Sequence, residues 1–437
     1  MYYIVETEEQ LNRLYCGGKE CYLNIIPLND QYHYSLNSPS LIYFKTLDCK
    51  GYIFPINHSE AYHLDFNKVI EWIDSKYDII YTINKKECLY FFDNKKLMDI
   101  SYKGSEYGSR LKDKMYDLYP TKPYINKLIP IGHHYNEQNQ IFKDIEDQII
   151  LHTDYKTPHN EFYSNKFPQV FKSIEEQGLK VNPKLFDKHF DYNHKEWFLK
   201  DGVVYTKYNL YNLTTRPTNS FNNINFAALN KKDGSRSAFI PKNDYFFEFD
   251  YDSYHVRIVA KLIDYPLSRD SVHTQLGMQY FGVDSLTSDQ YQQSKELTFK
   301  QLYGGVFKEY QNLPFFKSMT EYVNSLWDKF NTTKKLELIG GKVLTMDQIQ
   351  KPTPNKILNY LIQSAETYYN VKAVDKLINY LKTKQSKVVL YTYDSFLVDF
   401  SSKDGKQILP EIKEILESEG FVIKVAYGKD YDSLKEI

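Results

Sequence analysis

Short apolar runs separated by turn residues dominate the first part of the chain. Brief runs of β-branched and aromatic side chains predict strands, and longer stretches with apolar positions three or four apart predict helices. We therefore expect strands over residues 2–5, 21–26, 40–44 and 51–56, and helices over 60–75 and 97–116. Strands mixed with helices in this way are typical of an α/β domain.

The rest of the chain predicts a connector followed by an α+β region. Residues 117–160 are rich in Pro, Asn, Gly and His, which is typical of a connecting segment. Beyond it, the spacing of apolar residues predicts helices over 165–178, 183–190, 253–263, 289–303, 316–330, 354–381 and 409–419. Strands are expected over 245–250 and 421–426, with hairpins over 336–344 and 388–399. These distant strands should form one central antiparallel sheet.

The composition is that of a globular protein. Of 437 residues, 42% are hydrophobic and 25% charged, and the formal net charge is −1; this excludes large-scale disorder and a uniformly basic surface. No apolar run approaches the roughly 20 residues that cross a bilayer. Four cysteines without metal-binding spacing favour a reduced compartment. We expect a cytoplasmic protein without membrane contact, in which a local groove can still bind nucleic acid.

Two aspartates stand at the ends of strands that should be central. Asp250 ends the hydrophobic strand 245–250, and Asp394 lies at the turn of the hairpin 388–399. Mg²⁺ takes few protein ligands and completes its shell with phosphate and water. Two carboxylates at one sheet edge therefore predict a two-metal site for phosphoryl transfer. A single aspartate at a strand end is more often a turn or cap residue, so the pair needs support from elsewhere.

That support comes from the predicted helix 289–303. Lys295, Phe299 and Tyr303 lie four residues apart, on one helix face. A cation beside two aromatic rings is suited to a nucleotide, because the cation attracts the triphosphate and the rings contact base and sugar. The alternative interpretation is a packed helix with a lysine that extends to solvent.

Taken together, these segments resemble the family A DNA polymerases, the DNA polymerase I-like group. Asp250-Tyr-Asp-Ser-Tyr-His-Val-Arg257 is similar to motif A, Lys295 to Gly304 to motif B, and Tyr393-Asp394-Ser395 to motif C. Asn359 and Gln363 match a template-side helix. Leu213-Thr-Thr-Arg216, Asn223-Ile-Asn225, Arg236 to Ile240 and Tyr427 to Tyr431 resemble further family segments. The match runs in the family's order from about Phe167 to the C-terminus.

The resemblance implies a role for each matching residue. Asp250 and Asp394 would bind two Mg²⁺ ions, with Mn²⁺ as a possible substitute, and act with Lys295 in catalysis. The implied nucleotide contacts are Lys295, Phe299, Tyr303, His255, Tyr291 and Tyr251. The implied contacts to primer or template are Arg216, Asn225, Arg257, Asn359, Gln363 and Tyr393.

Several positions depart from the family pattern. His255 replaces a glutamate that crowds the sugar 2′ position, and we expect histidine not to reproduce that residue's pairing with Tyr303. Tyr291 replaces an arginine, and Tyr393 and Ser395 replace the His and Glu of motif C. Glu248, two residues before Asp250 on the same strand face, is a candidate replacement carboxylate, although a paired or exposed glutamate is the simpler interpretation.

Two regions are reduced relative to the family. Only 37 residues separate Gly178 from Arg216, so the thumb should be vestigial. Residues 1–130 resemble the 3′–5′ exonuclease domain, whose second strand carries Asp-x-Glu for two metals. Here that strand reads Cys21-Tyr-Leu-Asn24-Ile-Ile26, without an acid. We therefore expect a scaffold without proofreading.

The resemblance implies a DNA-directed DNA polymerase that extends a primer with dNTP during replication. Two alternatives remain open: a single-subunit RNA polymerase-like enzyme, and an inactive relative that only binds nucleic acid. A phage-type enzyme in the host cytoplasm, aided by a processivity or replication partner, fits the short chain. The expected parts are an exonuclease-like domain (1–130), connector and vestigial thumb (131–205), palm (206–265 and 339–437) and fingers (266–338).

Overall fold

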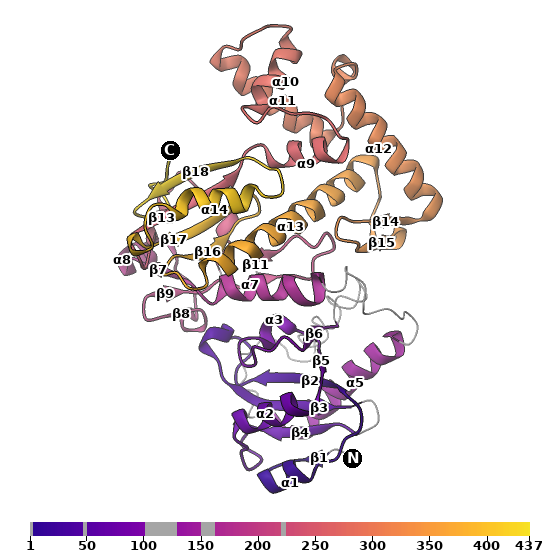
Figure 1. Ribbon diagram of the computed structural model, residues 1–437, viewed down its shortest axis with the longest axis vertical. Coiled ribbons are helices and arrows are strands. Elements are labelled where there is room, and N and C mark those ends of the chain that lie inside the picture. The colour runs from indigo at the N-terminus through magenta and orange to yellow at the C-terminus, as the bar shows by residue number, and fades with distance from the viewer. Residues whose placement is uncertain (1–2, 47–49, 101–128, 150–161, 220–223) are drawn as a thin grey trace. The chain divides into compact units, whose positions relative to one another are not determined.

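A computed structural model describes residues 3–46, 50–100, 129–149, 162–219 and 224–437 (Figure 1). The chain forms two compact units. Unit 1 comprises Met1–Tyr211 and Asn219–Ile240, and unit 2 comprises Asn212–Thr218 and Pro241–Ile437.

Unit 1 contains a mixed six-stranded sheet with the order β1-β4-β3-β2-β5-β6. The central pairs β2–β3 and β3–β4 are antiparallel, whereas β1–β4, β2–β5 and β5–β6 are parallel. The strands are β1 (Tyr3–Ile4), β2 (Glu20–Pro27), β3 (Pro39–Lys45), β4 (Tyr52–Pro55), β5 (Ile79–Thr82) and β6 (Leu97–Asp99). The four strands predicted before residue 60 are thereby confirmed.

Helices cover both faces of this sheet. Along β2, Cys21, Leu23 and Ile25 pack against α1, α2 and α3, whereas Tyr22 and Ile26 pack against α5, as the alternation of a strand requires. The bounds of these helices are α1 (Glu8–Arg13), α2 (Phe66–Lys76), α3 (Lys85–Cys88) and α5 (Ile131–Ile149), with a 3₁₀ turn η1 (Tyr34–Leu36).

Two predictions for this region were wrong. Residues Leu97–Asp99 form β6 and not the start of a helix, because they pair with β5; the rest of the helix predicted over 97–116 lies outside the described residues apart from Ile100. The segment predicted as a connector contains α5. Its polar composition hid a helix that buries Ile131, Ile141 and Phe142 against the sheet.

The remainder of unit 1 is built from short elements. A π-helical turn η3 (Phe162–Lys166) leads into α7 (Phe167–Glu175), and a small sheet has the order β12-β7-β9-β8. The bounds are β7 (Leu179–Val181), α8 (Pro183–His189), η4 (Lys195–Trp197), β8 (Leu199–Lys200), β9 (Val203–Val204), β10 (Tyr208–Asn209), β11 (Thr218–Asn219), η5 (Phe226–Ala228), η6 (Ser235–Ala238) and β12 (Phe239–Ile240). Between Gly178 and Arg216 the longest helix is α8, with 7 residues. That segment has no room for a long helical hairpin.

Unit 2 is organised around a five-stranded antiparallel sheet with the order β16-β17-β13-β18-β19. The strands are β13 (Tyr245–Tyr251), β16 (Lys387–Tyr391), β17 (Ser395–Phe400), β18 (Ile423–Gly428) and β19 (Lys435–Glu436). Apolar β13 lies in the middle, where both neighbours satisfy its backbone. This confirms the predicted sheet of distant strands.

The helices of unit 2 follow the predicted order, and α13 runs beside the sheet (Figure 1). Thr353 caps α13 and Pro354 occupies its first turn, which explains its sharp start. The bounds are α9 (Tyr254–Leu262), α10 (Val272–Phe281), α11 (Ser288–Gly304), η7 (Lys308–Tyr310), α12 (Pro314–Thr333), β14 (Lys335–Glu337), β15 (Val343–Thr345), η8 (Met346–Gln348), α13 (Pro354–Leu381), η9 (Ser402–Asp404) and α14 (Ile408–Glu417). None of the helices described here combines the length and apolar character that a membrane span needs.

Candidate functional site

Of the two predicted metal-binding aspartates, Asp250 lies on β13 of the central sheet and Asp394 lies in the turn between β16 and β17. Asp250 on β13 pairs in register with Ser395 on β17, the residue directly after Asp394. The backbone N–H of Tyr251 donates to the Asp394 carbonyl oxygen at 2.9 Å. Residues 144 positions apart in the chain are thus brought to one end of the sheet.

Asp394 occupies a rim position. The residue is exposed at the surface. Nevertheless, nearby protein atoms desolvate its carboxyl group and raise its pKa above the ordinary value, and the Glu366 carboxylate adds to this increase. One side of the carboxyl group therefore faces solvent and the other faces protein. A cation bound there would favour the ionised form.

The donor set of this sheet edge fits Mg²⁺ in kind. Asp250 and Asp394 would supply hard oxygen ligands, and Mg²⁺ is commonly held by one or two carboxylates plus phosphate oxygens and water. Within the described ranges, no three His, Cys, Asp or Glu side chains gather into a group that could hold a metal by themselves. The site would accordingly be completed by a phosphate-bearing ligand.

Lys295, Phe299 and Tyr303 share an open face of α11, as their spacing predicts. Phe299 is 39% exposed and Tyr303 42% exposed, and their rings lie 6.3 Å apart with 4° between the planes. Lys295 Nζ lies 5.5 Å from the centre of the Tyr291 ring. Such a face can accept a flat ring and an anionic tail together.

His273 on α10 adds a residue that sequence reasoning missed. Its ring lies 5.6 Å from Phe299 and 6.3 Å from Tyr291. Burial, with a further contribution from Lys295, lowers the pKa of His273 to about 4. Its Nδ1 atom has no hydrogen-bond partner among the described residues. A neutral imidazole therefore supports the aromatic face.

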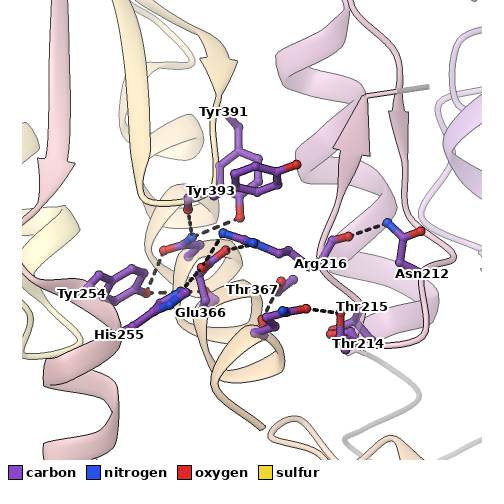
Figure 2. A network of polar contacts seen from close by, with 12 residues as sticks. Asn212, Thr214, Thr215, Arg216, Tyr254, His255, Glu366, Thr367, Tyr391 and Tyr393 are labelled. Atoms are coloured by element: carbon purple, nitrogen blue, oxygen red, sulfur yellow. Dashed lines mark hydrogen bonds and ion pairs between the residues drawn. The ribbon is translucent and has the colours of Figure 1, made fainter. Parts of the chain in front are cut away.

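Glu366 on α13 is the centre of a polar network that joins three segments of unit 2 (Figure 2). Its side chain is 0% exposed. Arg216 donates to both carboxylate oxygens, from Nε at 2.9 Å and from the guanidinium Nη2 at 3.1 Å. His255 Nε2 bonds the same carboxylate, and His255 Nδ1 bonds the Tyr303 hydroxyl. The expectation that histidine would not pair with Tyr303 was wrong, because the imidazole bridges Tyr303 to an acid that comes from another helix.

The charge state of Glu366 follows from its partners. Burial alone would raise the pKa of this carboxyl, but the His255 hydrogen bond and the Arg216 charge outweigh it and lower the pKa overall. Glu366 was not among the predicted site residues. A sequence signal existed: Asn359, Gln363, Glu366 and Asn370 are spaced by four, three and four residues, which makes a polar stripe on a largely apolar helix.

Tyr393 is held against Arg216 in an unusual backbone conformation. Its φ is 67°, in the left-handed region that disfavours large side chains. The Arg216 guanidinium stacks 3.7 Å from the centre of its ring. Asn370 donates to the Tyr393 carbonyl at 2.6 Å and to the Tyr391 hydroxyl at 3.2 Å. These contacts fix the turn that carries Asp394.

The remaining predicted contacts are spread over both units. Gln363 accepts from the Thr214 hydroxyl at 2.9 Å, and Asn359 Oδ1 is buried without a partner among the described residues. Tyr251 is buried with its hydroxyl on the Leu416 carbonyl. Arg257 is 8% exposed and donates to the Asp252 carboxylate and nearby carbonyls, so its side chain belongs to the interior. Asn225 lies in unit 1, before η5.

In unit 1, Asn24 occupies the strand position where an exonuclease would need acids. It is 6% exposed and donates to Gln138 on α5 at 2.8 Å. The buried side chain at this position is thus a neutral amide and not a carboxylate.

We therefore expect no removal of a mismatched 3′ end by this chain. A 5′-labelled mismatched primer, incubated with Mg²⁺ and no dNTP, should keep its length, while the same preparation extends a matched primer when dNTP is added. Shortening that disappears on Asp99→Asn, or on loss of another acid within residues 1–150, would contradict the expectation.

Comparison with known proteins bears on the fold. No family model and no curated protein matches the sequence. Among solved structures, the chain is similar to the POL domain of Pol1 from M. smegmatis, which was solved in complex with DNA primer-template and dNTP. The TM-score is 0.71 at 12% identity, over 95% of this chain and 96% of that one. This confirms the predicted α+β fold of the DNA polymerase I type, and the antiparallel sheet and helices of unit 2 are consistent with a palm and fingers.

Proposed function

We propose that the chain is a template-directed DNA polymerase that adds deoxynucleotides to a primer 3′ end. The observation that carries the proposal is the content of unit 2. It combines Asp250 on β13 and Asp394 in the turn before β17 with a helix face that presents Lys295, Phe299 and Tyr303, in a fold similar to a polymerase domain solved with primer-template and dNTP. Fold alone does not decide function, so the weight rests on these side chains.

In this proposal the open face of α11 binds the incoming nucleotide. Lys295 neutralises charge on the triphosphate, and Phe299 and Tyr303 contact the base and sugar. Tyr303 lies eight residues beyond Lys295, about 12 Å along the helix axis, which is suitable for a nucleotide bound along the helix. The cation and the rings would thus contact opposite ends of one ligand.

Asp250 and Asp394 would hold two Mg²⁺ ions at the edge of the sheet. When bound, such ions activate the primer hydroxyl and stabilise the charge that develops on the phosphoryl oxygens. The primer 3′-hydroxyl gives up its proton to water, its oxygen forms a bond to the α-phosphorus, the bond from that phosphorus to the bridging oxygen breaks, and pyrophosphate leaves. The part of this chain is to orient the reactants and to balance their charge.

The primer and template would be contacted by Arg216, Asn359, Gln363 and Tyr393. The short elements between Gly178 and Arg216 offer little surface for the duplex. Fewer phosphate contacts mean weak binding with a shallow salt dependence. A replication partner that restores grip, and an origin in a phage, are compatible with this picture.

Primer extension on a DNA template tests the proposal. Extension with dNTP and not with NTP supports a DNA polymerase. Equal use of NTP would favour the RNA polymerase-like alternative, and binding without extension would favour the inactive relative. The reaction should depend on Mg²⁺ or Mn²⁺ and stop on chelation.

Lys295→Ala should raise the KM for dNTP by about 10- to 100-fold, because a charge-assisted hydrogen bond contributes about 1.5–3 kcal/mol. Lys300→Ala is the matched control, because it removes another lysine of α11. The Lys300 ammonium lies 3.7 Å from the Glu296 carboxylate, which is a weak ion pair. Steady-state extension with one dNTP measures both. Equal KM values for the two variants would remove Lys295 from the nucleotide site.

A further inference from the structure

Glu366 holds the nucleotide side of the proposed site together without facing solvent itself. Its carboxylate is 0% exposed and accepts from Arg216 and His255, whereas His255 is 14% exposed and Tyr303 42% exposed. Glu366 can therefore affect a ligand only indirectly, through His255 and Tyr303, which a ligand can contact. The inference that follows rests on the proposed polymerase function.

The hydrogen bonds define which nitrogen of His255 carries a proton. An ionised carboxylate can only accept, so Nε2 must donate to Glu366. In the neutral ring Nδ1 then accepts from the Tyr303 hydroxyl. With both nitrogens engaged, the imidazole cannot rotate without loss of two hydrogen bonds.

Tyr303 needs this support because α11 presents it to solvent. Its ring has Phe299 on one side, and its hydroxyl is fixed by His255. Side chains can exclude the 2′-hydroxyl group of a ribonucleotide only if they cannot move aside. Tyr303 lies about two helical turns from Lys295 on α11, which is where the sugar of a nucleotide bound along the helix would lie.

We propose that Glu366 is a positioning residue for deoxynucleotide selection. It fixes the side chains of His255 and Tyr303 where they would contact the sugar and exclude a 2′-hydroxyl group. The carboxylate that the family places at position 255 is thus supplied from α13 and acts through an imidazole. The same carboxylate orients Arg216, which stacks on Tyr393. One buried acid therefore fixes both Arg216 and the pair formed by His255 and Tyr303.

Relocation of the acid tests this directly. The readout is the ratio of kcat/KM for a dNTP to that for the matching NTP. Glu366→Ala should lower the ratio about tenfold, the factor expected for loss of one hydrogen bond. Adding His255→Glu places a carboxylate next to Tyr303 and should restore the ratio. A merely structural role would slow both substrates alike and would not be rescued.

Asp399→Asn is the matched control. Asp399 is a buried acid at the end of β17 that is distant from Asp394. Its carboxylate accepts hydrogen bonds from the backbone N–H groups of Lys242 and Asn243. Its loss should lower the melting temperature and leave the ratio unchanged. A fall in the ratio as large as that of Glu366→Ala would mean that loosening of unit 2 is the cause, which would overturn the proposal.

A second measurement needs no catalysis. Nitrogen-15 NMR of labelled histidine, with His255→Gln to assign the signal, should show the proton on Nε2. In Glu366→Ala no carboxylate remains to accept from Nε2, whereas the Tyr303 hydroxyl can still accept from Nδ1, so the proton should move to Nδ1. Tyr303→Phe should leave the proton on Nε2.

The outcomes separate the two proposals. If the wild type extends primers but Glu366→Ala keeps the ratio or keeps the proton on Nε2, the role of Glu366 is refuted and the polymerase stands. If the wild type extends nothing, the proposed function fails, and the NMR result alone decides whether Glu366 positions His255. Should Glu366→Ala not fold, Glu366→Leu, which keeps most of the side-chain volume and has no acceptor, supplies both readouts.

Discussion

Asparagine in place of either Asp250 or Asp394 should abolish primer extension, by at least about 10³-fold, because each carboxylate would hold a metal ion whose charge stabilises the transition state by several kcal/mol. The substitution keeps the shape of the side chain and removes its charge. Extension of a labelled primer under single-turnover conditions measures the loss. Binding of Mn²⁺, followed by electron paramagnetic resonance, should weaken in parallel.

Asp244→Asn is the control for these two variants. Asp244 stands at the opposite end of β13, where its carboxylate accepts from the N–H and hydroxyl of Ser402 at 2.7 Å each. It should extend primers at the wild-type rate. Substantial extension by Asp250→Asn or Asp394→Asn, with folding unchanged, would mean that the chemistry uses other residues.

The chemistry-bearing elements were predictable because their apolar patterns are strong. The strand ending near Asp250, the hairpin around Asp394 and the helix from Pro354 to Leu381 all have the predicted type. Their local periodicity agrees with their final burial, so no tertiary contact had to override it. The order of the motifs then predicted the sheet that brings the aspartates together.

The polar network could not be predicted in the same way. Glu366 lies within a helix where a glutamate ordinarily faces solvent, and only packing turns it inward. Its partners Arg216 and His255 are 150 and 111 residues away in the chain. The sequence-based expectation considered only the charge of His255 itself, whereas in the structure His255 is hydrogen-bonded to the Glu366 carboxylate. The polar stripe on α13 indicates a buried face, but it does not specify which residues lie opposite.

Burial of charge is also strong in unit 1, where Lys86 and Glu175 form an ion pair. Their side chains are only 4% and 1% exposed. Glu175 accepts as well from the Tyr90 hydroxyl at 2.9 Å and from the Tyr208 backbone N–H, and Lys86 donates to the Tyr208 carbonyl at 2.6 Å. Burial lowers the pKa of the Lys86 ammonium, although Glu175 opposes this shift. The pair thus joins α3 and α7 to the start of β10.

Glu175→Gln should destabilise unit 1 by about 3–5 kcal/mol, because it leaves the Lys86 charge buried without a counter-charge. Urea unfolding of the full chain measures this, with Trp327→Phe as background so that fluorescence reports Trp72 and Trp197 of unit 1.

Glu176, the residue that caps the C-terminal end of α7, provides the comparison that isolates burial. Glu176 pairs with Lys172 at 2.6 Å, but their side chains are 35% and 16% exposed. Because water solvates that pair, Glu176→Gln should cost less than about 1 kcal/mol. The double variant Lys86→Met/Glu175→Gln should regain most of the stability lost in Glu175→Gln, since no unpaired charge is left inside. If Glu175→Gln and Glu176→Gln cost the same, or the double variant is no more stable than Glu175→Gln, the Lys86 charge is not what the structure must neutralise, and the hydrogen bonds to Tyr90 and Tyr208 carry the effect.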